Sequence, residues 1–102
     1  MTNTRVVRSD DESRYEIFVG DGEEETLAGY AEFTVDGATT TFPRTIIDPD
    51  FGGRGLGTTL VAAAVADVAA RGGTIVPLCP FVEKYLRGND VPGAVVEWPD
   101  RG

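Results

Sequence analysis

The stretch DFGGRGLGTTL, residues 50–60, places four glycines within six positions directly before a long apolar segment. Glycine lets the backbone curl tightly, and the free N–H groups at the start of a helix attract anions. Gly53, Gly55 and Gly57 would allow several N–H groups to point at one phosphate. The spacing therefore predicts an anion-binding loop at a helix N-terminus.

The loop matches neither of two common nucleotide-binding motifs. The dinucleotide pattern GxGxxG needs a third glycine where the chain has Leu60. The P-loop pattern needs a lysine after GxxxxG, and Thr58 stands in that position. Ordinary nucleoside triphosphate chemistry is therefore excluded. A helix-capping turn without any ligand stays open at this point.

The elements before the loop read as strands, because their residues alternate or are rich in β-branched types. The predicted strands are residues 4–8, 14–19, 27–35 and 38–47, with SDDES and residues 20–26 as loops. Asp36-Gly37 is a turn pair that is typical of tight hairpins. Pro43 cannot donate to a strand ladder, so a bulge or an exposed edge is expected beside it.

The elements after the loop change to a helical period. Apolar residues from Leu56 to Val68 recur four positions apart, and Arg71 followed by two glycines ends the pattern. A short buried strand at 74–78, a short helix at 81–86 and a last strand at 94–98 follow. An antiparallel meander followed by strand, loop, helix and strand predicts a mixed α/β domain.

Composition narrows the function further. The chain of 102 residues is expected to form one domain, and its net charge of −8 argues against nucleic-acid and anionic-membrane partners. An acidic surface suits a cationic acceptor such as an amine, although it also keeps a protein soluble. Cys79 is the only cysteine, which favours a cytoplasmic location, and no metal site is expected.

A longer segment carries a family resemblance. The stretch RTIIDPDFGGRGLGTTLVAAAVADVAARGGTIVPLCPFVEKYL, residues 44–86, resembles the small stand-alone (YjdJ-type) branch of the GNAT superfamily of predicted N-acetyltransferases. The shared points are a T-x-(V/I)-x-P segment, the glycine loop and a P-x-C-P-F-V-x-x-Y segment. Gly55, Leu56 and Gly57 match the end of that family's pyrophosphate motif, Q/R-x-x-G-x-G/A, while Gly52 replaces its first residue.

The resemblance implies acetyl-CoA as the cofactor and a minimal GNAT-like domain over residues 1–102. It implies a mostly antiparallel sheet, a central helix after the pyrophosphate loop and a short C-terminal helix. SDDES is too short for the family's usual N-terminal helices, so an open acceptor side is expected. The implied cofactor contacts are Ile46 and Ile47, through their backbone, and Arg54, Gly55, Leu56, Gly57 and Thr58.

Three residues are candidates for catalysis in such a site. Cys79 is a thiolate nucleophile, a wall of the thioester pocket or simply a small buried residue. Tyr85 packs in the core or, as the resemblance implies, protonates the leaving thiolate. Glu32 lies on a solvated face or acts as the base. Arg44 stands where family members often carry histidine and the chain has none, so the base is Glu32, Glu83 or water, or the amine arrives already neutral.

The expected function is transfer of an acetyl group from acetyl-CoA to an amine by direct attack in a ternary complex. The acceptor is a small molecule or a protein, and the open acceptor side favours a large or flexible amine. The alternative is a catalytically silent acyl-CoA-binding or protein-interaction module. A homodimer is left open.

Overall fold

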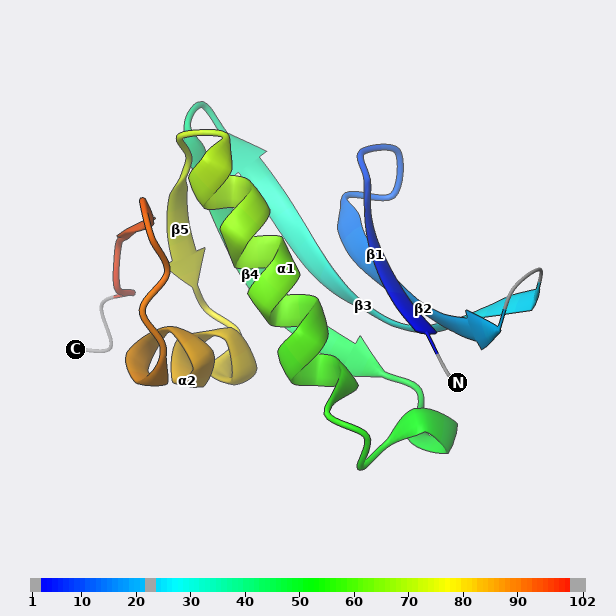
Figure 1. Cartoon of the computed structure of the whole chain (residues 1–102). Helices are drawn as coiled ribbons and strands as arrows, with labels where there is room; N and C mark the ends of the chain where they lie inside the picture. Colours follow the sequence, from blue (N-terminus) through cyan, green and yellow to red (C-terminus); the bar gives the residue numbers. More distant parts are fainter. Residues whose placement is uncertain (1–2, 22–23, 100–102) are drawn as a thin grey trace.

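The computed structural model describes residues 3–21 and 24–99. In this part of the chain, strands in sequence order form one curled sheet (Figure 1). The first three pairings are antiparallel and the last two are parallel. The strands are β1 (Asn3–Ser9), β2 (Arg14–Asp21), β3 (Glu24–Asp36), β4 (Thr39–Ile47), β5 (Thr74–Pro77) and β6 (Val95–Val96).

Two α-helices pack on this sheet. Helix α1 (Leu56–Ala70) crosses the strands, and α2 (Pro80–Gly88) lies beside its N-terminal half (Figure 1). A 3₁₀ turn, η1 (Pro49–Phe51), leads from β4 toward α1. The predicted helical face is confirmed, because the residues of α1 that pack into the core are buried. They are Leu56, Leu60, Val61, Ala64, Val65 and Val68.

The core beneath α1 is built around three aromatic rings. Tyr15, Phe33 and Phe42 come from three neighbouring strands, and all three are buried. Their ring centroids lie 5.3 to 6.4 Å apart in tilted or edge arrangements, which are favourable for aromatic pairs. The small side chains of α1 let the helix approach these rings closely.

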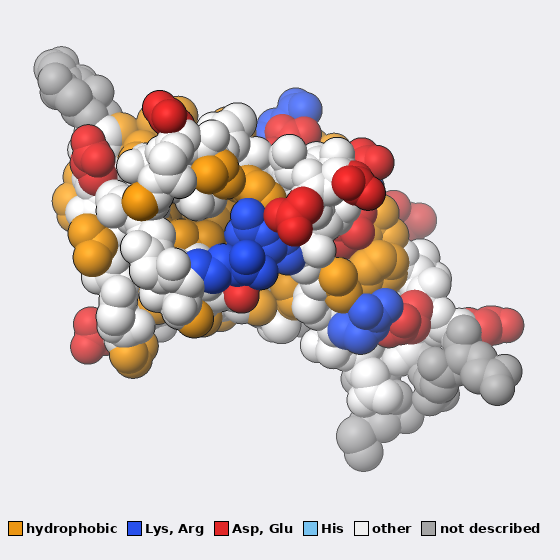
Figure 2. Space-filling view, turned by 90° about the horizontal axis from the view of Figure 1, so that it is seen from above, with side chains coloured by type: hydrophobic (Ala, Val, Ile, Leu, Met, Phe, Trp, Pro, Cys, Tyr) orange, Lys and Arg blue, Asp and Glu red, His pale blue; other side chains and the backbone are white. Residues whose placement is uncertain are grey.

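A polar network fastens the C-terminal half of α1 to the sheet. The Tyr15 hydroxyl donates to Asp67 Oδ2 at 2.6 Å, and Arg8 Nη1 donates to the Tyr15 hydroxyl at 2.8 Å. Arg71 Nε donates to the same Asp67 oxygen at 2.8 Å. Figure 2 views the molecule from the end that carries this network and shows basic side chains in contact with acidic ones.

The bulge predicted beside Pro43 is confirmed. Strand β3 pairs Glu32 with Arg44 and Thr34 with Thr41, so Phe33 alone faces two residues of β4. Pro43 has no N–H group to donate to the ladder. The bulge accommodates it, because the extra residue in β4 interrupts the regular hydrogen bonding at this point. The pairing of β4 with β5 ends at the same point, with the pair Phe42–Pro77.

The predicted mixed α/β class is confirmed, with a mostly antiparallel sheet, a central helix and a short C-terminal helix. A tight turn at residues 10–13 joins β1 to β2, so no helix lies between them. Two element boundaries were wrong. Residues 20–26 are not a loop, because both flanking strands extend into them, although residues 22–23 lie outside the described part. The last strand covers only Val95–Val96 rather than 94–98. No helix in the described residues is long and apolar enough to cross a membrane.

Candidate active site

The loop between β4 and α1 leaves a helix N-terminus open. Gly53 and Gly55 adopt positive φ angles of 79° and 73°, which residues with a side chain rarely adopt. Gly55 is the N-cap residue, and no side chain caps the helix. The N–H groups of the first helical turn, from Gly55 to Thr58, have no acceptor within the helix. Together with the helix dipole they form a setting that stabilises an anion.

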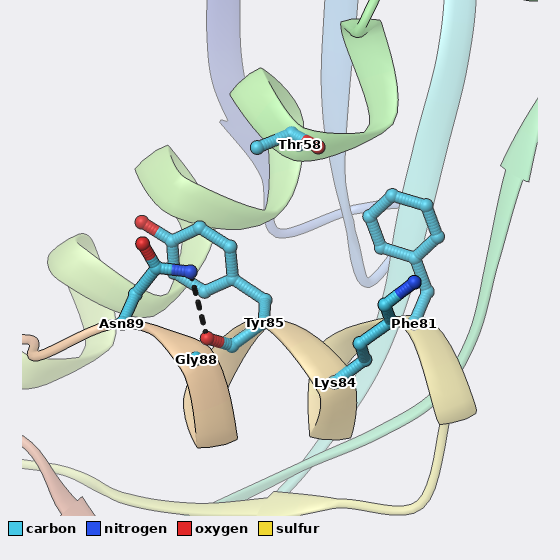
Figure 3. A pocket seen from close by; sticks show the side chains of 6 residues that line it. All are labelled: Thr58, Phe81, Lys84, Tyr85, Gly88 and Asn89. Carbon is cyan, nitrogen blue, oxygen red and sulfur yellow. Dashed lines mark hydrogen bonds between the residues drawn. The ribbon is translucent and has the colours of Figure 1, made fainter.

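Two adjoining cavities surround this loop. The first has a volume of about 290 Å³ and is lined by five of the predicted cofactor contacts, namely Ile47, Gly55, Leu56, Gly57 and Thr58. The second has about 430 Å³ and lies between α1 and α2 (Figure 3). Thr58 and Phe81 line both cavities, so the two adjoin at these side chains. The structure thus brings most of the predicted cofactor contacts to one place.

Two predicted contacts lie elsewhere. The side chain of Ile46 lines a separate apolar cavity with Leu27 and Tyr30, because alternation along β4 sends it to the opposite face from Ile47. Only its backbone remains available on the cofactor side. The guanidinium of Arg54 lies over the Phe51 ring, 5.5 Å from the centroid, and Arg54 is not among the described residues that line the loop cavity.

The second half of β4 has an unpaired backbone edge. Strands β4 and β5 pair only from Thr39–Thr74 to Phe42–Pro77. Cys79 N then donates to Phe42 O at 2.8 Å, and the chain turns into α2. Residues 43–47 continue along β3 alone, so in the described sheet no strand lies on their other side. This edge leads directly toward the glycine loop.

Cys79 is buried where β5 and β4 separate. It is 4% exposed, and its thiol lies 3.4 Å from Thr45 Oγ1, the acceptor of a weak hydrogen bond. Cys79 is also the N-cap residue of α2. The side chain therefore forms part of the wall at the end of the unpaired β4 edge, next to Thr45.

Tyr85 is half-buried and lines the larger cavity with Phe81 and Asn89 (Figure 3). The Asn89 amide donates to the carbonyl oxygen of Tyr85 at 3.0 Å, which closes the end of α2. Tyr85 therefore faces the groove between the helices, whereas Cys79 contacts β4. The structure therefore places these two candidates apart, Tyr85 in the cavity between the helices and Cys79 against Thr45 of β4.

Glu32 lies away from both cavities. It forms an ion pair with Arg44 across the β3–β4 ladder, and Arg44 Nη2 donates to Glu32 Oε1 at 3.0 Å. The hydrogen bond from Arg44 lowers the pKa of Glu32, which makes this carboxylate a weaker base. Arg44 thus holds the carboxylate that sequence reasoning considered as a proton acceptor.

Sequence reasoning missed three residues of the region. Phe81, Lys84 and Asn89 line the larger cavity with Tyr85 and Gly88. The spacing of Phe81, Lys84, Tyr85 and Gly88 by three or four positions signals one helix face and could have revealed them. Thr45 contacts Cys79, although in the sequence it reads only as a strand residue.

A curled mixed sheet, a glycine loop that opens a helix and a parallel strand pair that separates beside it define the architecture of an N-acetyltransferase. The family model described as GCN5-related N-acetyl-transferase matches residues 14–92. The chain therefore belongs to the GCN5-related N-acetyltransferase family, as the resemblance predicted.

A solved structure shows the same fold. The ribosomal-protein-S18-alanine N-acetyltransferase from Escherichia coli matches with a TM-score of 0.53 and 16% sequence identity. The match covers 74% of this chain and 64% of the other, so the chain corresponds to less than two thirds of that enzyme. The comparison with curated protein sequences gave no match.

Proposed function

We propose that the protein is an acetyl-CoA-dependent N-acetyltransferase that acts on an amine by direct attack in a ternary complex. The observation that carries the proposal is the continuity between the uncapped glycine loop and the unpaired edge of β4. A diphosphate fits the loop, where Gly55 brings no side chain and the first N–H groups of α1 are free. An extended amide-bearing arm fits the β4 edge through hydrogen bonds to the backbone of residues 43–47.

The bound acetyl-CoA would supply an acetyl group already activated as a thioester. The protein's part is to bind and orient it. Holding two reactants in the reacting geometry lowers much of the activation barrier of a bimolecular reaction. Gly55, Leu56, Gly57 and Thr58 would hold the diphosphate through their N–H groups. Tyr85 is the proposed donor of a proton to the departing sulfur, and Cys79 the wall beside the reacting carbonyl.

The lining of the two cavities favours an acceptor that arrives as a neutral amine. Among the described residues that line them, Lys84 and Tyr85 are the only titratable ones. Neither is a carboxylate or an imidazole, so the described lining holds none of the side chains that most often act as general bases. The same observation favours a second candidate function, a catalytically silent acyl-CoA-binding module.

The proposal is tested by binding and turnover together. Acetyl-CoA at one hundred times its Kd should stabilise the fold by about 2.7 kcal/mol, seen as a rise in Tm. Release of coenzyme A thiol in the presence of a panel of amines should then follow. Saturable binding without turnover for any amine would favour the silent module, and no binding would overturn both functions.

The Gly55→Glu variant localises the binding to the loop. A carboxylate at the helix N-terminus would occupy the place of the diphosphate and weaken acetyl-CoA binding by at least about tenfold. Gly93→Glu is the matched control, because Gly93 also has a positive φ of 78° and open space around it, but lies outside both cavities. Equal binding by the two variants would place the anion site elsewhere.

A further inference from the structure

The distribution of ion pairs singles out two basic side chains. The described part of the chain contains eight Lys and Arg residues, and six of them pair with a carboxylate: Arg5, Arg8, Arg14, Arg44, Arg71 and Arg87. Arg54 and Lys84 are the two that do not. In a protein with a net charge of −8, an unpaired cation is an unusual local feature.

Both unpaired cations lie beside the glycine loop, but only Lys84 lines a cavity. The guanidinium of Arg54 lies over the Phe51 ring, and Arg54 is not among the described lining residues of either cavity. Lys84 extends from α2 next to Phe81, with Thr58 of α1 across the cavity from them (Figure 3). Thr58 and Phe81 also line the loop cavity, so the ammonium group of Lys84 lies one side chain away from the proposed diphosphate site.

We propose that Lys84 binds the ribose 3′-phosphate of coenzyme A and makes the protein selective for coenzyme A over its 3′-dephosphorylated form. The inference rests on the proposed function. In coenzyme A the ribose carries the diphosphate at its 5′ position and the third phosphate at its 3′ position. The third phosphate must therefore lie within one ribose of the loop, which is where the second cavity begins.

The size and lining of the second cavity agree with this assignment. Its volume of about 430 Å³ falls within the usual range for small-ligand sites. The Phe81 ring is 42% exposed and offers an apolar surface for a nucleoside, while Thr58 and Asn89 offer polar groups. No carboxylate is among the described residues that line this cavity, so none of them neutralises Lys84 or repels a phosphate.

The test compares the Kd of coenzyme A with that of dephospho-coenzyme A by isothermal titration at low salt. A charge-assisted contact at a partly exposed site predicts a preference of about tenfold for coenzyme A in the unaltered protein. Lys84→Met, which keeps the apolar stem and removes the charge, should bind both ligands with equal affinity. Lys84→Arg should keep most of the preference.

Arg87→Met is the matched control on the same helix. Arg87 is exposed and already paired with Glu83, so its loss should leave the preference unchanged. Equal affinities in the unaltered protein, or a preference that Lys84→Met retains, would overturn the role of Lys84 while leaving the proposed function intact. Failure of both ligands to bind would overturn the proposed function itself. Circular dichroism establishes that each variant is folded.

Discussion

At the scale of single residues, the glycines of the loop have different tasks. Gly53 and Gly55 adopt positive φ angles that the turn requires, whereas Gly57 leaves room for a neighbouring side chain. A Cβ atom on Gly57 would lie 2.8 Å from Cζ of Phe81, a distance that real side chains essentially never show. Gly57 therefore allows the ring of α2 to rest against the first turn of α1, and this contact sets the boundary that the two cavities share.

Tyr85 should matter for the chemical step rather than for binding. If its hydroxyl protonates the departing sulfur, Tyr85→Phe lowers kcat by about 10² while the Kd of acetyl-CoA stays the same. Steady-state kinetics and titration measure the two quantities separately. A variant with unchanged kcat would show that Tyr85 only packs against the core.

Cys79 should be dispensable for turnover if the amine attacks directly. We expect Cys79→Ala to retain substantial kcat, with a small loss of stability because the side chain is buried. The unaltered protein should show no acetyl adduct by mass spectrometry after incubation with acetyl-CoA alone. A stoichiometric adduct on Cys79 that an added amine removes would establish a covalent route instead.

At the scale of elements, α1 is fastened at both ends by different means. Its first turn rests on Phe81, while its last turns are held by the network around Asp67. Burial alone would raise the pKa of Asp67, but the hydrogen bonds from Tyr15 and Arg71 outweigh burial and lower it. This fastening keeps the helix N-terminus in position relative to the end of β4.

Tyr15→Phe should loosen that attachment. The lost hydroxyl bonds to two charged groups, so we expect the free energy of unfolding to fall by about 1.5–3 kcal/mol in urea titrations. Tyr30→Phe is the control, because in the described residues the hydroxyl of Tyr30 makes no hydrogen bond, although its ring stacks with Arg14. Equal losses in the two variants would contradict the role of the network.

The Tyr15 hydroxyl also makes the free energy of unfolding depend on pH in the alkaline range. Burial and the hydrogen bond to Asp67 raise the pKa of Tyr15 to about 12, against about 10 for an exposed tyrosine. A group whose pKa is higher in the folded than in the unfolded protein adds to the free energy of unfolding. This contribution is fully present below the pKa of the unfolded state, and it is lost as the pH rises to the pKa of the folded state. The unaltered protein should therefore lose more stability than Tyr15→Phe between about pH 10 and 12.

The sequence predicted these elements well because their signals are local. The spacing of Leu60, Ala64 and Val68 marks a helix face, and Pro43 marks a bulge. It failed where a tertiary partner decides the outcome. The acidic residues Glu24 and Glu25 read as loop, yet they extend β3 because β2 offers them a partner. The spacing of Phe81, Lys84 and Tyr85 marks one face of a helix, but only the cavity between the two helices shows that this face lines a site.

At the scale of the whole molecule, the chain lacks histidine, and a turn rather than a helix joins β1 to β2, on the side where the acceptor is proposed to enter. The acceptor amine should therefore reach the site from solvent and lose its proton there. We expect kcat/KM to rise with pH through the pKa of the acceptor, near 8 for an α-amine and near 10.4 for a lysine side chain. An inflection shared by both acceptors and lost in Glu32→Gln would instead identify Glu32 as the base.

The early end of the β4–β5 pairing has a consequence for self-association. An unpaired strand edge normally invites another chain to add a strand, which leads to aggregation. Here the edge at residues 43–47 lies inside the sheet, with α2 packed against β4 beside it. A peptide strand with side chains on both faces would meet that helix, whereas a narrow unbranched arm with its own amide groups would not. The same gap that would admit the proposed cofactor would thereby protect the free protein from edge-to-edge aggregation.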